Sequence, residues 1–378
     1  MPHNMENPLN REYSKPVDPA GIPQKAKTAR AVTSRDVARE AGVSQSLVSL
    51  VLSNKAGKKI RPQTRAHVLA VARELGYRPN LQARAMKLRK ARAIGLLSTW
   101  DTGSFVFPPV VNGLKEICDR EGMALTLCTG RADTGGVPDY VAYYLENRID
   151  GLVYLSHVGV TSEGTIARLM ESRIPFVCAI GARDLQGVSS VDVDFLHNGR
   201  LAAEHLLATG CRHPLLYVPQ PANYAERERC AGFTEAFDAR GLQVRRMDAG
   251  ATARTGNALV DTLRAQLRAY PQTDGFCACT HTAWHMLKAA ALEGWPVPHR
   301  LRVISMDNDF YAPYLTPSLS TVDEPLEDIG REAGDMLLGL MDGTAPGEKR
   351  ALPLRVTVRA SSGEAICAEA SGQAGGDG

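Results

Sequence analysis

The sequence is 378 residues long and contains no apolar run that approaches the roughly 18 residues of a membrane-spanning segment. Its first ten residues, MPHNMENPLN, are polar and do not resemble a secretory leader. The eight cysteines are scattered without a C-x-x-C pair, so neither a disulfide framework nor a common zinc-binding spacing is indicated. These absences predict a cytoplasmic protein with reduced, buried thiols.

Enzyme signatures are absent as well. The sequence has no G-x-x-x-x-G-K-[ST], no G-x-S-x-G and no G-x-G-x-x-G. Four residues near position 280 are of types that bind zinc: Cys277, Cys279, His281 and His285. Because both cysteines fall on an apolar run that predicts a buried strand, we expect no metal site. The sequence therefore favours a binding protein without a cofactor over an enzyme.

What the sequence does have is an uneven distribution of charge. Residues 1–93 contain 19 Lys and Arg against 6 Asp and Glu, a net charge of +13, whereas the other 285 residues contain 25 against 35, a net charge of −10. A basic segment attached to an acidic body is typical of a protein that binds an anionic polymer, above all nucleic acid.

The two ends of the chain differ from its middle. Residues 1–30 are rich in proline and poor in aromatic residues, which predicts a disordered basic extension. Residues 362–378 are rich in Gly, Ala and Ser and predict a flexible tail.

Residues 31–78 carry the pattern of three short helices, which predicts a small all-α head. Thr33 and Asp36 have the spacing of a capping box at the start of the first helix, and Ser44 is the expected cap of the second. Pro62 is expected to open the third helix. Two short helices joined by Ala-Gly-Val fit a helix-turn-helix, whose second helix enters the major groove of DNA.

The outer face of the second helix supplies the candidate base contacts. Gln45 suits base edges, Ser46 and Ser49 suit bases or phosphates, and Leu50 suits a thymine methyl group. A helical bundle that only packs on the body is the alternative. The strong positive charge of the segment favours DNA binding.

Residues 93–361 alternate between short apolar runs and amphipathic helices, from AIGLLSTW (93–100) to LRVISM (301–306). Repeated βα units predict parallel sheets with helices on both faces. Some 270 residues exceed one core, so we expect two doubly wound lobes with a ligand site between them.

These segments together resemble the lactose-repressor (LacI/GalR) family of bacterial transcription factors. The resemblance rests on VTSRDVAREAGVSQSLVS, on TRAHVLAVARELGYRPN (64–80) and on NGRLAAEHLLATGCRHPLLYV (198–218), and it runs from about residue 32 to about 360. It implies a homodimeric regulator, most often a repressor, whose lobes resemble periplasmic sugar-binding proteins. It also implies that a small sugar-like effector controls the affinity for operator DNA.

The resemblance also implies roles for particular residues. Thr33 and Ser34 join the helix-turn-helix contacts, and residues 79–92 match the family's hinge helix and linker, which enters the minor groove. There Met86 would be the apolar wedge and Ala83 would fit the groove floor. The remaining expected hinge contacts to DNA are Asn80, Arg84 and Lys87.

For the effector site, the resemblance implies contacts from both lobes. Arg229 and Asp307 fall where the family binds its ligand, and a structural helix salt bridge is the alternative role of Arg229. The other expected contacts are Ser104, Phe107, His281 and Glu324.

Two departures from the family pattern leave the effector open. Thr280-His281 stands where the family has Asn-Asp, and the position of an effector-stacking aromatic is near Ala251. Three interpretations stay open at this point: a regulator controlled by a sugar or sugar acid, a ligand-blind regulator with a vestigial cleft, and a catalytic domain fused to a DNA-binding head. The sequence names neither the operator nor the direction of the effector response.

Overall fold

The computed structural model describes residues 32–52, 60–77, 91–155, 160–182, 185–220, 222–248, 256–344 and 347–363. The chain divides into two compact units, residues 1–84 and residues 85–378. Within the described residues, no helix is both long enough and apolar enough to cross a membrane.

The first unit contains three helices, α1 (Ser34–Glu40), α2 (Gln45–Leu52) and α3 (Pro62–Glu74). The predicted caps are confirmed: Thr33 and Asp36 form a capping box, the backbone N–H of Leu47 donates to Ser44 Oγ, and Pro62 opens α3. The three helices enclose a small core that is centred on fully buried Val37, Val48 and Val68. Each cap satisfies backbone groups that the helix itself leaves unpaired, so these short helices begin where the sequence predicts.

The first lobe of the second unit is a six-stranded parallel sheet in the order β11-β5-β4-β3-β1-β2. Helices α5 and α12 cover one face, with Val110, Leu114 and Ile329 in the core, and α6 and α7 cover the other. The bounds of its elements are β1 (Ala93–Ser98), α5 (Phe107–Glu121), β2 (Ala124–Cys128), α6 (Asp139–Leu145), β3 (Gly151–Leu155), α7 (Val160–Glu171), β4 (Phe176–Ala179), β5 (Ser190–Val193), α12 (Leu326–Asp342) and β11 (Lys349–Leu352).

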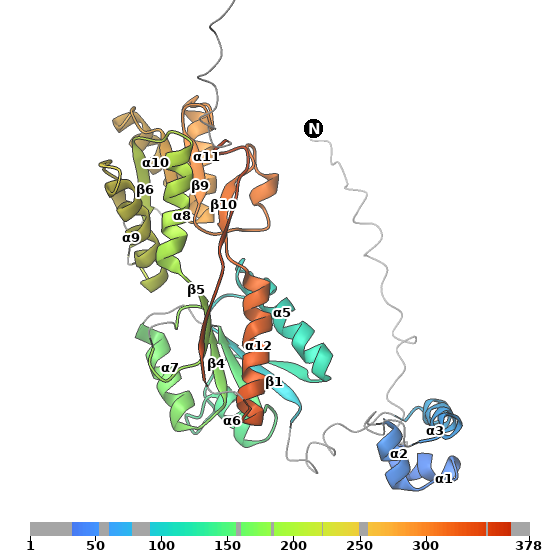
Figure 1. Cartoon of the computed structure of the whole chain (residues 1–378). Coiled ribbons are helices and arrows are strands. Elements are labelled where there is room, and N and C mark those ends of the chain that lie inside the picture. The colour runs from blue at the N-terminus through green and yellow to red at the C-terminus, as the bar shows by residue number, and fades with distance from the viewer. Residues whose placement is uncertain are drawn as a thin grey trace, which may run out of the picture. The chain divides into compact units, whose positions relative to one another are not determined.

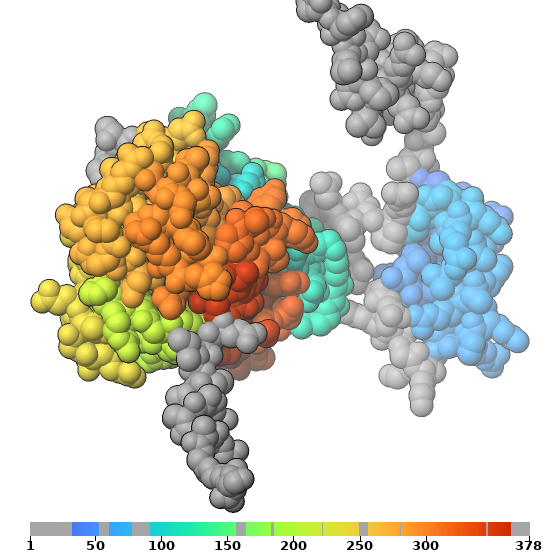
Figure 2. All heavy atoms as spheres, turned by 90° about the horizontal axis from the view of Figure 1, so that it is seen from above, coloured from blue at the N-terminus to red at the C-terminus, as the bar shows by residue number. Residues whose placement is uncertain are grey.

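The second lobe repeats this plan in a sheet ordered β12-β10-β9-β8-β6-β7, in which only β12 runs antiparallel to its neighbour. Helices α8 and α9 pack on one face, and α10 and α11 pack on the other. Its elements are α8 (Phe195–Ala208), β6 (Pro214–Val218), α9 (Tyr224–Asp238), β7 (Arg245–Asp248), α10 (Gly256–Ala269), β8 (Gly275–Ala278), α11 (Thr280–Leu292), β9 (Arg302–Ser305), the 3₁₀ turn η4 (Ala312–Tyr314), β10 (Ser320–Asp323) and β12 (Arg355–Thr357). The surface coloured yellow to orange in Figure 2 belongs to this lobe and includes α10 and α11.

The chain passes between the two lobes three times (Figure 1). It leaves the first lobe after β5 to form α8, returns after β10 to form α12, and leaves again after β11 to form β12. The structure thus confirms the predicted fold, a small helical head and a body of two doubly wound lobes.

Two helix pairs approach each other closely because small residues lie at their contacts. A methyl group at Gly199 of α8 would come within 1.8 Å of the Arg229 carbonyl oxygen on α9, and one at Gly232 would come within 1.9 Å of the Leu196 carbonyl oxygen. Gly113 of α5 and Gly330 of α12 have the same role in the first lobe. Each lobe therefore has one pair of helices in backbone contact.

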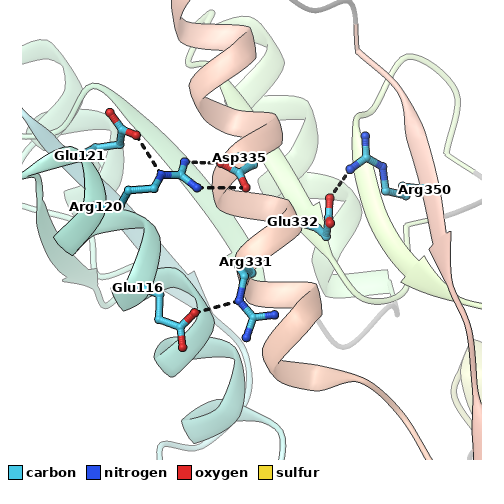
Figure 3. A network of polar contacts seen from close by, with 7 residues as sticks. All are labelled: Glu116, Arg120, Glu121, Arg331, Glu332, Asp335 and Arg350. Carbon is cyan, nitrogen blue, oxygen red and sulfur yellow. Dashed lines mark hydrogen bonds and ion pairs between the residues drawn. The ribbon is translucent and has the colours of Figure 1, made fainter.

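Ion pairs cross the α5–α12 contact and extend to β11 (Figure 3). Arg331 Nε donates to Glu116 at 2.8 Å, and Arg120 pairs with Asp335. Arg350 of β11 pairs with Glu332. All of these side chains are more than a third exposed, so water screens each pair and its contribution is small, and the buried glycine contacts dominate the packing.

The predicted boundaries need several corrections. Strand β7, helix α12 and strands β10 to β12 are not among the elements that the sequence pattern predicted. Ser362 is 1% exposed, and its hydroxyl contacts both His205 and Ser320, so the tail boundary predicted at residue 362 falls inside the packed body.

Candidate nucleic-acid interface and ligand site

Helix α2 presents an exposed polar face in the first unit. Val48 and Val51 are buried against α1 and α3, which turns Gln45, Ser46 and Ser49 to the outside. Leu50 lies beside them and is 42% exposed. An exposed leucine on an otherwise polar helix face is typical of a surface that a partner covers. In the major groove of DNA, the methyl group of thymine is the part of a base that such a side chain can contact.

The starts of α1 and α2 meet at this face. The amide Nε2 of Gln45 donates to Ser34 Oγ at 2.9 Å, and the hydroxyls of Ser44 and Ser46 lie 3.1 Å apart. Thr33 is engaged in its capping box, where its hydroxyl donates to Asp36 at 2.7 Å. The structure therefore places Ser34 and Gln45 side by side at this face, and Thr33 caps α1.

The predicted hinge residues Asn80, Ala83, Arg84, Met86 and Lys87 lie outside the described residues, as does Ala251. What the structure does describe is the point where this segment joins the body. The backbone N–H groups of Ala91 and Arg92 donate to the Asp150 carboxylate at 2.7 and 2.6 Å. Asp150 thus fixes the chain just before β1.

In the second unit, the predicted ligand residues follow the carboxyl ends of strands. Asp307 comes two residues after β9, and Glu324 follows β10 directly. Arg229, from the second turn of α9, forms an ion pair with Glu324 whose side chains are only 9% and 4% exposed. Ligands of parallel α/β folds bind at this edge of the sheet.

Burial and charge act together on this cluster. Burial raises the pKa of Glu324, the charge of Asp307 raises it further, and the Arg229 guanidinium opposes both. Burial would lower the pKa of Arg229, but the charge of Glu324 shifts it upward. Asp307 is 3% exposed and accepts a hydrogen bond from Ser305 Oγ at 2.9 Å. Arg229, Asp307 and Glu324 therefore form one buried polar group.

Sequence reasoning missed three members of this site. Asp192 of β5 accepts hydrogen bonds from the backbone N–H groups of Gly181, Ala182 and Val193, and its charge is coupled to that of Glu324. The Phe195 ring lies 5.1 Å from the Arg229 guanidinium carbon. The third member is Cys279, whose Sγ lies 3.9 Å from Arg229 Nη1. A carboxylate inside the apolar run near 188–193 was the available signal for Asp192.

The other predicted ligand residues have contacts of their own. Ser104 Oγ accepts a hydrogen bond from the Phe107 N–H at the start of α5, and Phe107 packs on the core of the first lobe. His281 is exposed, and its ring lies 5.3 Å from that of Trp284. The structure thus places His281 in an aromatic group rather than in the buried polar cluster.

The four residues considered for zinc have separate surroundings. Cys277 is fully buried on β8, Cys279 faces Arg229, and His285 Nε2 accepts from the Gly256 N–H. Over the described ranges, no group of three or more His, Cys, Asp or Glu side chains is arranged to hold a metal ion. The seven cysteines described are free thiols, six of them buried.

Comparisons with known protein families agree with this architecture. The family described as "Bacterial regulatory proteins, lacI family" matches residues 33–80, and the "Periplasmic binding protein-like domain" matches residues 203–362. The HTH-type transcriptional repressor PurR of Proteus mirabilis is 30% identical over 320 residues, which cover 81% of this chain and 89% of that protein. Catabolite control protein A of Priestia megaterium is 26% identical over 88% of this chain and 99% of its own length.

Solved structures share the fold. The lac repressor dimer bound to operator and to the anti-inducer ONPF matches with a TM-score of 0.72 and 23% identity, over 88% of this chain and 99% of that one. The complex of the transcriptional regulator CelR with cellobiose matches with a TM-score of 0.60 and 26% identity, over 87% and 99%.

Proposed function

This chain belongs to the LacI family of bacterial regulatory proteins, and from that membership we propose that it is a cytoplasmic transcriptional repressor whose affinity for operator DNA is set by a small effector. The observation that carries the proposal is the exposed face of α2, where Gln45, Ser46, Ser49 and Leu50 stand together. These side chains read the major groove. The relatives are transcriptional regulators, and we propose that this chain too has no catalytic activity.

Selection of operator sequences from a random duplex library tests this function. The wild-type protein is expected to enrich one sequence motif. Leu50→Ala should weaken binding to the selected operator, with a cost of about 1–3 kcal/mol, and leave binding to scrambled DNA nearly unchanged, because base contacts carry sequence discrimination. Leu145→Ala is the matched control, since Leu145 is an exposed leucine of the body. Equal loss on both DNAs would contradict a base contact.

The segment after the head is proposed to be a second DNA contact. Its basic residues Arg84 and Lys87 would neutralise phosphates, and Met86 would act as the apolar wedge in the minor groove. This role rests on the sequence and the family. Asp150, which fixes the chain at residues 91–92, then links any movement of the first lobe to this segment.

Effector control is proposed to act through the buried polar group Arg229, Asp307 and Glu324, which lies beside a passage of the chain between the lobes. Glu324 stands between β10 and α12, at one of the three passages of the chain. A ligand that contacts Arg229 and Asp307 of the second lobe and Ser104 of the first would change how the lobes close. By linkage, operator DNA must change the affinity for the effector by the same factor.

We also propose a homodimer, as found for the lac repressor that shares the fold. Phe310, Tyr311 and Tyr314 are 75%, 57% and 72% exposed and contact one another through their rings. Together with Trp284, whose ring contacts Tyr311, they make an apolar patch on the second lobe. Large exposed aromatic patches of this kind mark protein interfaces.

A thermal-shift screen with sugars, amino sugars, sugar acids and nucleobases distinguishes a ligand-responsive regulator from one with a vestigial site. A compound that stabilises the body and also changes operator affinity supports the proposed function. Stabilisation accompanied by chemical conversion of the compound would instead support a catalytic domain.

A further inference from the structure

The guanidinium at the centre of the ligand site is already neutralised by the protein. Arg229 pairs with Glu324, a residue 95 positions away, and both side chains are more than nine-tenths buried. A carboxylate or phosphate ligand at this arginine would either displace Glu324 or bind beside it on the same guanidinium. The first leaves Glu324 as a buried carboxylate without its cation, which is strongly unfavourable. The second places two negative groups side by side in a buried site.

The other charges near this ion pair are negative. The charge of Asp307 raises the pKa of Glu324, and the charge of Glu324 raises the pKa of Asp192. Asp307 and Asp192 are 3% and 1% exposed, so water screens their charges weakly. With one cation and three carboxylates, the described part of the site repels an incoming anion.

Two buried polar atoms, one on Arg229 and one on the residue that follows Asp307, have no hydrogen-bond partner among the described residues. Arg229 Nε is buried and has no hydrogen-bond acceptor among the described residues, although Nη2 of the same guanidinium is paired with Glu324. The side-chain oxygen of Asn308, the residue after Asp307, is also buried without a donor. Buried polar groups are rarely left in this state, and a ligand with both a neutral oxygen and N–H or O–H donors would satisfy them.

Building on the proposed function, we infer that the effector of this protein is an uncharged or positively charged molecule rich in hydroxyl or amine donors, and that Glu324 excludes carboxylated and phosphorylated ligands. Polyols, amino sugars and unionised nucleobases fall in this class, and sugar acids do not. Glu324 is thus a specificity-determining residue, since its carboxylate neutralises the Arg229 guanidinium that would otherwise attract an anion.

The first test needs no knowledge of the effector and uses the full-length protein. Inorganic phosphate and acetate, at matched ionic strength against chloride, should leave the thermal unfolding of the wild-type body unchanged. In Glu324→Gln, the guanidinium loses its charged partner, and affinity for phosphate should increase by about tenfold or more. The double variant Arg229→Gln/Glu324→Gln, without either charge, is the control and should lose this gain.

Two results would overturn the inference. Stabilisation of the wild-type protein by phosphate or acetate would show that its arginine is available to anions. A folded Glu324→Gln variant that gains no affinity for phosphate would show that Glu324 is not what excludes them. If that variant does not fold, the wild-type measurement alone still decides.

A set of ligands on one carbon frame then tests the class directly. The first set consists of glucose, glucosamine, gluconate and glucose 6-phosphate, which differ mainly in charge. The second set consists of adenine, uracil and orotate, and it compares neutral nucleobases with an anionic one. Any compound that changes operator binding should be neutral or cationic, and an anionic compound that does so refutes the inference while leaving the regulator function intact. Failure to bind any selected operator would instead refute the proposed function, whatever the anion measurements show.

Discussion

Arg229 and Glu324 stabilise the body only as a pair. Their side chains are 9% and 4% exposed, so removal of either one leaves the other charged and buried. We predict that Arg229→Ala lowers the free energy of unfolding of the body by about 3–5 kcal/mol, in addition to abolishing the effector response. Asp307→Ala should also abolish that response. Denaturant titration of the purified variants measures the stability term.

The double variant Arg229→Met/Glu324→Leu is the control for this prediction. It replaces both charges by apolar groups of similar size, so most of the lost stability should return. An Arg229→Ala protein as stable as wild type would mean that Glu324 finds another cation or becomes neutral at no cost.

Asp192 makes the free energy of unfolding of the body depend on pH. Burial raises the pKa of this carboxyl from 3.8 to about 6, despite three backbone N–H donors that favour the charged form. Its folded pKa exceeds its unfolded pKa, so the stability that it contributes is present below pH 4 and is lost as the pH rises through 6.

Asp192→Asn should therefore become more stable relative to wild type between pH 4 and pH 7, by about 3 kcal/mol for a shift of this size. The difference in unfolding free energy between the two proteins is the quantity to measure, since carboxyls remote from Asp192 titrate equally in both. A difference that stays constant over this range would contradict the raised pKa.

At the scale of helices, the close pairs α8–α9 and α5–α12 depend on glycine. A methyl group at Gly199 would meet the Arg229 carbonyl oxygen at 1.8 Å, and backbone atoms of a helix cannot move aside as a side chain can. We predict that Gly199→Ala costs about 3 kcal/mol or more, and that it also disturbs Arg229 in the ligand site.

Gly164 of α7 is the matched control, because nothing lies within 4 Å of the place where its methyl group would be. Gly164→Ala should be neutral or stabilising by up to about 1 kcal/mol, since alanine favours a helix. Thermal unfolding of both variants gives the comparison, and equal losses would show that helix packing is not the cause.

Elements with local signals could be predicted from the sequence. Thr33, Ser44 and Pro62 mark helix starts by their own chemistry, and the alternation from residue 93 to residue 306 reveals the parallel sheets. Strand β7 was missed because RRMD, an exposed edge strand, has no apolar run. Strand β11 was missed for the same reason: KRAL is paired only at the edge of a sheet formed by segments far away in the chain.

The site was predictable only in part, for a similar reason. Arg229, Asp307 and Glu324 could each be named, but nothing local shows that Arg229 pairs with Glu324 rather than with a ligand. That pairing depends on how α9 meets the end of β10. Asp192 was missed because its partners are backbone groups, which the sequence does not display.

For the whole molecule, we predict a dimer that does not need the C-terminal residues. Residues 362–378 contain one Ile, one Cys and no Leu, so they cannot form the apolar seam of a tetramerising coiled coil. Deletion of residues 364–378 should leave the oligomeric state in sedimentation unchanged. Tyr311→Glu should weaken the dimer by about tenfold or more, because it places a charge in the aromatic patch.

Leu145→Glu, at another exposed position of the body, serves as its control and should leave the dimer intact. A tetramer that disappears on removal of the tail would refute this arrangement, and a Tyr311→Glu protein with unchanged dimer affinity would place the interface elsewhere.

The three passages of the chain between the lobes have a consequence for synthesis on the ribosome. The head, residues 32–77, is one continuous stretch and can fold as soon as it emerges. The first lobe, although most of it is translated early, lacks α12 and the edge strand β11 until residue 352 is made, and the second lobe lacks β12 until residue 357. The two lobes are therefore completed only five residues apart, and a ribosome that stops before residue 352 releases a DNA-binding head whose sensor is unfinished.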